Sequence, residues 1–111
     1  MLDEKWRAYA KSWSQPKEAR EAALAELVIE DVAYTDPNNH LRGRETFSAH
    51  MAQFQEDVPG GFFDITAVKG HHNQSLAHWN LCGPDGSTLM AGISHASLSE
   101  DGKFTAFTGF F

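Results

Sequence analysis

The sequence predicts an α+β fold in which three helices from the N-terminal half cover one face of a curved, mainly antiparallel sheet. Three segments before residue 60 are helical in pattern, and two of them carry apolar residues every three or four positions. From Phe62 onward the period changes to two, which is typical of strands, and the turn sequences GPDG and EDG separate the later segments. Helices segregated from an antiparallel sheet favour this fold class.

The first helix is predicted from a stripe of aromatic residues near the start of the chain. Trp6, Tyr9 and Trp13 recur at helical spacing. This helix should stop near Ser14, because Pro16 cannot continue it.

Two further helices and one strand are expected before residue 61. Pro16 suits the first turn of a second helix, and the strong helix formers of residues 17–30 continue it. The segment VAYTDP then reads as a strand that ends at Asp36. A third helix over GRETFSAHMAQFQEDV should end at the following PGG. The apolar residues that predict this helix are Phe47, Met51, Phe54 and Val58.

The second half of the chain reads as four strands. Hairpin turns between the later ones predict that the last three form an antiparallel meander. The expected strands are residues 62–70, 72–82, 87–99 and 103–111. A sheet bent over a helix leaves a cone-shaped space.

Composition and charge restrict the class of function. The 111 residues suit one domain, residues 1–111, and their formal net charge of −6 leaves no basic stripe for nucleic acid. No apolar run approaches the ~20 residues that span a bilayer. Cys82 is the single cysteine, so no internal disulfide is possible, and a cytoplasmic location is expected.

No metal-binding or nucleophile motif stands out. The six histidines include no H-E-x-x-H pattern, and strand neighbours such as His71 and His72 should point to opposite faces. We therefore expect no metal and no cofactor. What the chain offers is aromatic walls and a few ionisable residues directed inward, which is sufficient for general acid–base chemistry. These residues are Tyr9, Tyr34, Asp36 and His50.

Two interpretations of Asp36 remain open at this point. The acid precedes Pro37 in a D-P-N-N turn sequence, where it can simply accept hydrogen bonds from backbone amides. Alternation along the strand instead places Val32, Tyr34 and Asp36 on one face, so that the carboxylate leaves the strand at the rim of a buried surface.

The order of elements and several short sequences together resemble the NTF2-like superfamily. This group includes nuclear transport factor 2, ketosteroid isomerase and the SnoaL-like polyketide cyclases. The matching sequences are KSW at the end of the first helix, VAYTDP followed by RGRETF, LAHWNLCGPDGSTLMAGIS, and the closing DGKFTAFTGFF. The resemblance spans nearly the whole chain and implies a single SnoaL-like domain with the cystatin-like cone of this superfamily.

The resemblance also implies roles for individual residues. In the ketosteroid isomerase branch, the aspartate after the first strand is the general base, and Asp36 stands at that position. A tyrosine of the first helix donates to the oxyanion, which matches Tyr9. The second donor of that branch is an aspartic acid, but Ser94 stands here. His50 matches a pocket-lining position of the third helix.

The same match assigns the two faces of the sheet. Ala77, Trp79, Met90, Gly92 and Ser94 would face the cavity. The opposite face, which pairs subunits in many members of the superfamily, would form a homodimer.

The leading hypothesis is a binding site for a small hydrophobic carbonyl compound. If the protein is an enzyme, Asp36 would act as base, assisted by His50, with Tyr9, Tyr34 or Ser94 donating to the oxyanion. The alternative is a non-catalytic ligand-binding or dimerisation module, and a third hypothesis is dehydratase or epoxide-hydrolase chemistry at His50 or His72. The expected pocket walls are Trp13, Phe47, Met51, Phe54, Trp79 and Met90.

Overall fold

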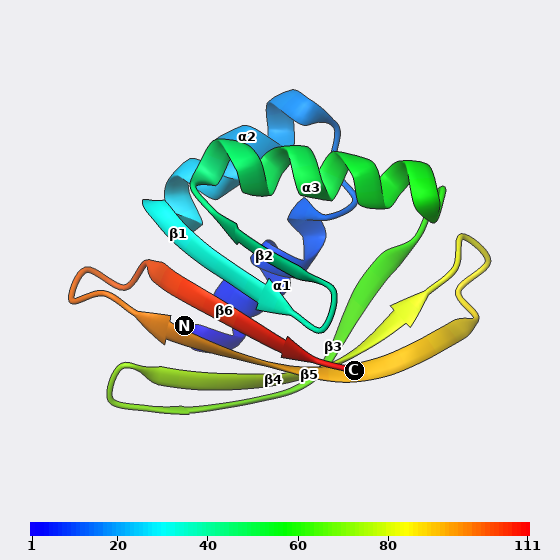
Figure 1. The fold of residues 1–111 in the computed structure, drawn as a ribbon. Helices are drawn as coiled ribbons and strands as arrows, with labels where there is room; N and C mark the ends of the chain where they lie inside the picture. The colour runs from blue at the N-terminus through cyan, green and yellow to red at the C-terminus, as the bar shows by residue number, and fades with distance from the viewer.

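Three helices pack on a curved, six-stranded, mainly antiparallel sheet in the computed structural model, which describes residues 1–111 (Figure 1). The predicted α+β fold class is confirmed. None of the helices is long and apolar enough to cross a membrane. The elements are α1 (Leu2–Ser12), α2 (Lys17–Leu27), β1 (Val28–Asp36), β2 (Asn39–Arg42), α3 (Arg44–Asp57), β3 (Phe62–His71), β4 (Gln74–Cys82), β5 (Thr88–Leu98) and β6 (Phe104–Phe110).

Helix α2 is shorter than the sequence predicts. Its helical pattern was expected to run to Glu30, but the helix ends at Leu27 and β1 begins at Val28. Val28 and Ile29 are β-branched, which favours the extended conformation. Val28 pairs with Phe104 of β6 and is fully buried. Pairing within the sheet therefore overrides the local preference for helix.

The six strands lie in the order β2-β1-β6-β5-β4-β3. Strands β3 to β6 form an antiparallel meander. Strand β1, from the first half of the chain, pairs in parallel with β6, the last strand. The sequence predicted five strands and missed β2. Asn39 to Arg42 turn back on β1 after the Pro37 turn and pair with it in antiparallel register.

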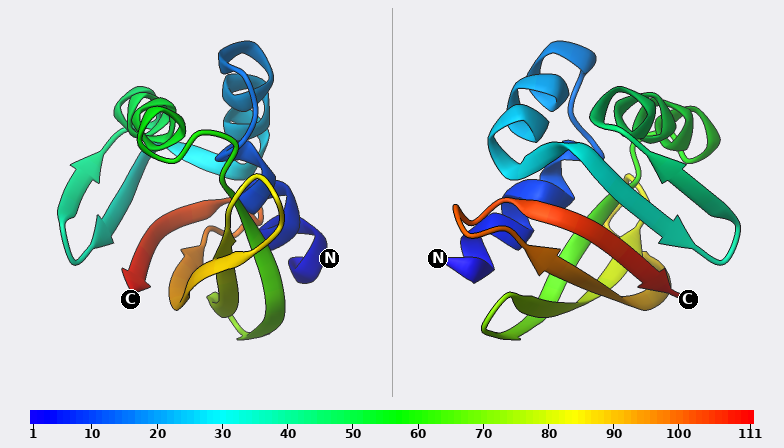
Figure 2. Two further views of the ribbon diagram at one scale, coloured as in Figure 1. Left: turned by 90° about the vertical axis from the view of Figure 1, so that its right-hand side faces the viewer. Right: turned by 60° about the vertical axis from the view of Figure 1, so that its left-hand side comes forward.

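The sheet wraps around α1, and α2 and α3 cover the open side of the curve (Figure 2). A cluster of 17 buried side chains fills the space between helices and sheet. Aromatic rings dominate it: Trp6 lies 5.1 Å from Phe104 between ring centroids, and Tyr9 stacks on Phe107 at 4.1 Å. The predicted aromatic stripe of α1 therefore forms the centre of the core.

Candidate functional site

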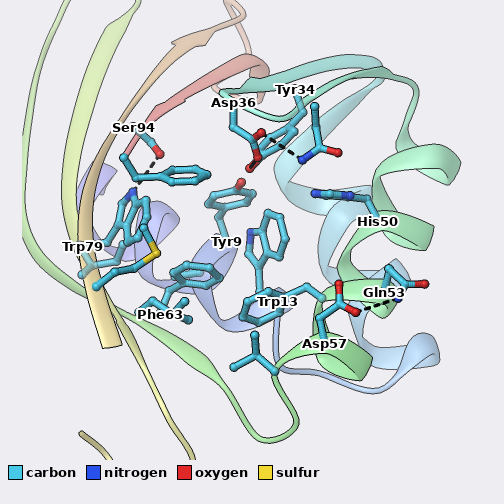
Figure 3. A pocket seen from close by; sticks show the side chains of 18 of the residues that line it. Tyr9, Trp13, Tyr34, Asp36, His50, Gln53, Asp57, Phe63, Trp79 and Ser94 are labelled. Carbon is cyan, nitrogen blue, oxygen red and sulfur yellow. Dashed lines mark hydrogen bonds between the residues drawn. The ribbon is translucent and has the colours of Figure 1, made fainter. Parts of the chain in front are cut away.

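A cavity of about 290 Å³ lies between α1, α3 and the concave face of the sheet (Figure 3). Nineteen residues line it, and 13 of them are hydrophobic. Eight lining residues are aromatic: Trp6, Tyr9, Trp13, Tyr34, Phe54, Phe63, Trp79 and Phe111. The other polar lining residues are Asp36, Asn39, His50, Gln53, Asp57 and Ser94. A mostly apolar concavity with a few converging polar groups is the usual form of a small-molecule site.

Asp36 serves both purposes that the sequence left open. Its Oδ1 accepts hydrogen bonds from the backbone N–H of Asn38 at 2.8 Å and from Nδ2 of Asn39 at 3.0 Å, which fixes the turn. Its Oδ2 accepts a hydrogen bond of 2.7 Å from the Tyr34 hydroxyl, and the residue lines the cavity. One oxygen therefore holds the backbone while the other belongs to the site.

The environment of Asp36 keeps its carboxyl group ionised. Partial burial raises the pKa of this group, but the hydrogen bonds from Tyr34, Asn38 and Asn39 together outweigh that effect. The net result is a pKa below the ordinary value of 3.8. Hydrogen bonds donated to a carboxylate favour its charged form. At neutral pH, Asp36 therefore presents a negative charge to the cavity.

Tyr34 is the donor that orients this carboxylate. Burial raises the pKa of its hydroxyl most, and the neighbouring Tyr9 and Asp36 raise it further. The phenol consequently stays protonated and donates. Its ring is held against Phe47, with centroids 4.9 Å apart, and the ring of His50 lies 5.5 Å away.

Tyr9 directs its hydroxyl toward the same end of the cavity as Asp36 (Figure 3). Burial raises the pKa of this phenol, the Trp13 side chain lowers it by less, and the charge of Asp36 adds to the rise. Its ring stacks on Phe107, so the side chain has little freedom. Tyr9 is thus a rigid, protonated donor that reaches the cavity from the core.

Ser94 lies on β5, on the far side of β6 from Asp36. Its Oγ accepts a hydrogen bond of 3.0 Å from the indole N–H of Trp79, which leaves the serine proton free to donate. Gly109 of β6 separates the two residues. A Cβ at Gly109 would lie 3.6 Å from both the Asp36 Cβ and the Ser94 Oγ. The absence of a side chain there keeps the space between carboxylate and hydroxyl open.

His50 shares the cavity with Asp36 without pairing to it. Its ring lies 5.6 Å from Trp13 and 5.5 Å from Tyr34 between centroids. No ion pair joins it to Asp36. The imidazole is therefore held by aromatic neighbours on the α3 side, with Tyr34 between it and the carboxylate.

Most of the residues expected in the pocket wall do line the cavity, but Phe47 and Met51 do not. Trp13, Tyr34, Phe54, Trp79, Met90 and Ser94 are in the lining. Phe47 and Met51 are 1% and 0% exposed and lie in the core. They occupy the face of α3 that packs against α1 and β1, whereas Phe54 lies on the cavity side. Their assignment as wall residues was wrong.

Several lining residues were missed by the sequence interpretation, above all Gln53 and Asp57 on α3. With His50 and Phe54 they follow one another at spacings of three, one and three residues, which places all four on one side of the helix. That spacing was visible in the sequence. Phe63 and Phe111 also line the cavity, and they carry no comparable signal because strand alternation alone does not tell which face is inside.

His71 ends β3 and His72 begins the turn to β4, away from the cavity, and the two do not point to opposite faces as predicted. His72 has a φ of 53°, so the chain leaves the strand conformation there. The two Nδ1 atoms are consequently 3.0 Å apart. No group of three or more His, Cys, Asp or Glu side chains is placed to bind a metal ion.

Comparison with solved structures confirms the fold. The chain is similar to a proposed isomerase of the SnoaL-like family from Agrobacterium tumefaciens, with 24% identity, a TM-score of 0.91, and 98% of this chain and 95% of that chain covered. An NTF2-like protein of unknown function from Cytophaga hutchinsonii matches with 13% identity and a TM-score of 0.75, covering 100% and 89%. A proposed SnoaL-like polyketide cyclase from Jannaschia sp. matches with 17% identity and a TM-score of 0.72, covering 98% and 78%. These likenesses show the fold.

The match to a family model agrees with the structural comparisons, although none of the curated proteins compared matches this chain. The SnoaL-like domain model matches residues 6–107, from within α1 to within β6. Together with the cone-shaped arrangement of helices and sheet, this match shows that the chain belongs to the SnoaL-like domain family.

Proposed function

We propose that this protein binds a compact hydrophobic carbonyl compound in the cavity and moves a proton within it, as an isomerase or cyclase does. The observation that carries the proposal is the convergence of the ionised Asp36 carboxylate and the Tyr9 hydroxyl on one end of an apolar cavity. A carboxylate and a protonated donor in a site with dry walls are the minimum requirement for enolisation.

The chemistry follows from the placement of these groups. Asp36 takes a proton from the carbon next to the substrate carbonyl, and the electron pair of that C–H bond moves into the enolate. The oxygen of the enolate becomes negative and accepts hydrogen bonds from Tyr9 and Ser94. Asp36 then returns the proton to another carbon, so the enzyme ends in its starting state. Tyr34 keeps the carboxylate in position throughout.

Because the pKa of Asp36 is lowered, most of the rate enhancement must come from stabilisation of the oxyanion. A carboxylate that accepts several hydrogen bonds is a weak base, so the enolate itself must be stabilised for the proton to leave carbon. Tyr9 is well suited to this, because its phenol is rigid and the surrounding aromatic rings exclude water. His50 would assist by carrying a proton between the substrate and the α3 side.

Two of the structural neighbours are described as a proposed isomerase and a proposed polyketide cyclase. Proton transfer at a carbon next to a carbonyl is one route by which isomerisation and polyketide cyclisation both proceed. They therefore support the same reaction class for this chain.

Deuterium exchange into 2-tetralone, an enolisable two-ring ketone, tests the proposal. Proton NMR in D₂O measures how fast the protein replaces the protons next to the carbonyl. We expect Asp36→Asn to lose about 10²-fold or more of the protein-catalysed rate, as when a general base is removed. Asp85→Asn is the matched control, because Asp85 also accepts a turn N–H, from Ser87, but lies outside the cavity.

The result separates catalysis from simple binding. Equal rates in the parent and Asp36→Asn would overturn the assignment of Asp36 as base. Binding of 2-tetralone by calorimetry with no exchange above buffer would instead favour the non-catalytic ligand-binding module, which the weak basicity of Asp36 also fits.

The outer face of the sheet supports a homodimer as part of this proposal. The Cα of Gly109 in β6 faces Asp36 and Ser94, so its neighbour Phe110 points to the opposite face of the sheet, where it is 59% exposed. Large apolar side chains on a sheet face are typical of a subunit interface. Sedimentation velocity of the parent and Phe110→Glu tests this: a parent that sediments as a monomer contradicts it.

Cys82, a free cysteine, is compatible with the proposed cytoplasmic location.

A further inference from the structure

The charged side chains that line the cavity are acidic, and the imidazole of His50 is the only basic group among the lining residues. Asp36 and Asp57 line it, and neither lysine nor arginine does. The whole chain carries a formal charge of −6, so the long-range field has the same sign. A carboxylate-bearing or phosphate-bearing ligand would meet only repulsion from these acids, while a cation would be attracted.

The two acids lie at different ends of the cavity. In Figure 3, Asp36 stands near Tyr9 and Tyr34, whereas Asp57 lies at the opposite side of the view with Trp13 between them. Asp57 is exposed, and its Oδ1 accepts a hydrogen bond of 3.0 Å from Nε2 of Gln53. Its Oδ2 accepts no hydrogen bond from the protein, so it remains available at the mouth of the cavity.

The walls beside Asp57 also favour a cation. Phe54 precedes Asp57 by three residues on α3, which places the two side chains next to each other. The Phe54 ring contacts Trp13 and Phe63, with centroid distances of 5.5 Å and 5.1 Å. Faces of such rings attract ammonium groups when these lie within about 6 Å of the centroid.

From these observations we infer that the ligand is an amine-bearing hydrophobic carbonyl compound, with its ammonium group at Asp57 and its carbonyl at the Tyr9 end. The inference rests on the proposed function, because it concerns the ligand of the same cavity. It gives the ligand a defined orientation in the cavity. Because Asp57 holds the ammonium group, Asp36 stays free to act as base at the carbonyl end.

Three naphthalenes of the same size test this inference by isothermal titration calorimetry at about pH 8. They are 2-naphthylmethylamine, which is a cation, 2-naphthalenemethanol, which is neutral, and 2-naphthoate, which is an anion. We expect the amine to bind several-fold more tightly than the alcohol, and the anion about tenfold more weakly than the alcohol. Asp57→Asn should bring the amine and the alcohol to nearly equal affinity. Glu56→Gln is the control, because Glu56 is exposed on α3 but does not line the cavity.

The alcohol separates failure of this inference from failure of the proposed function. If the alcohol binds but the amine gains nothing over it, or if Asp57→Asn keeps the gain, only the charge preference is overturned. If none of the three binds, both proposals are overturned together. Loss of the gain in Glu56→Gln as well as in Asp57→Asn would assign the preference to overall charge and would contradict a specific role for Asp57.

Discussion

The Tyr34 hydroxyl donates a hydrogen bond of 2.7 Å to Oδ2 of Asp36, two residues further along β1. Residues two apart on a strand share a face, so this contact follows from the alternation of the strand itself. It ties the carboxylate that faces the cavity to a phenol that is anchored in the core by Phe47. The position of Asp36 is therefore set from both sides, by its turn and by its own strand.

Tyr34→Phe should raise the pKa of Asp36. Among the influences that lower this pKa, the hydrogen bond from Tyr34 is the largest, and its removal leaves the raising effect of burial less opposed. The carboxylate becomes a stronger base. A pH titration of the Asp36 side-chain carbon by NMR measures the change, and a pKa equal to or lower than that of the parent would contradict the assigned cause.

Asp36 should stabilise the fold above pH 4 and lose this contribution in acid. Its pKa is lower in the folded protein than its ordinary value of 3.8, so the unfolded chain binds the proton more readily. The contribution is present above the unfolded pKa and disappears as the pH falls through the folded pKa. Urea unfolding between pH 7 and about pH 2 should show the difference between the parent and Asp36→Asn shrinking below about pH 4. A difference that stays constant over this range argues against the lowered pKa.

Gly92→Ala should disturb the Trp79 wall of the cavity. A Cβ at this position would clash with the Trp79 ring, so the indole must move, and this disturbs its hydrogen bond to Ser94. Overpacking of this kind costs about 1–3 kcal/mol. Urea unfolding measures the loss, and calorimetry with 2-naphthalenemethanol should show weaker binding.

Ala91→Val is the matched control for this change, because Ala91 is the exposed neighbour on the opposite face of β5. Surface substitutions of this type usually stay within about 0.5 kcal/mol. A similar loss of stability in both variants would show that the strand, and not the Trp79 contact, is sensitive.

Gly109→Ala should reduce ligand binding while preserving the fold. The new methyl group would lie at ordinary contact distance, 3.6 Å, from Asp36 and Ser94, so no atom has to move. It nevertheless fills the space between the carboxylate and the serine hydroxyl. We expect an unfolding free energy within about 1 kcal/mol of the parent. We also expect slower protein-catalysed deuterium exchange into 2-tetralone. Unchanged exchange would mean that the substrate does not use this space.

Phe47→Ala and Phe54→Ala should differ, because one residue belongs to the core and the other to the cavity wall. Phe47 is 1% exposed and contacts Tyr9, Trp13, Tyr34 and Phe107. Its truncation should cost about 3–5 kcal/mol. Phe54 is only partly buried, so its truncation should cost less and should mainly weaken binding of 2-naphthalenemethanol. Equal losses of stability would contradict this division of α3.

Local patterns in the sequence were sufficient for every element except β2, but not for all their ends. The stripe of Trp6, Tyr9 and Trp13 predicts α1, and the period of two after Phe62 predicts the four later strands. The boundary at Val28 could not be predicted, because its extended conformation depends on pairing with Phe104, more than 70 residues away. Strand β2 was missed for a similar reason, since four residues carry too little pattern to reveal a partner strand.

The candidate site divides in the same way. That Val32, Tyr34 and Asp36 share a face, and that Pro37 ends their strand, follows from the sequence by itself, because alternation and proline geometry are local properties. Whether Phe47 or Phe54 faces a cavity was decided only by how α3 packs against α1 and β1. Asp36 and Ser94 likewise lie near each other only because β6 pairs with both β1 and β5 and places Gly109 between the two residues. Short-range backbone preferences thus determined the elements of this protein, and long-range strand pairing and helix packing determined which of their side chains meet.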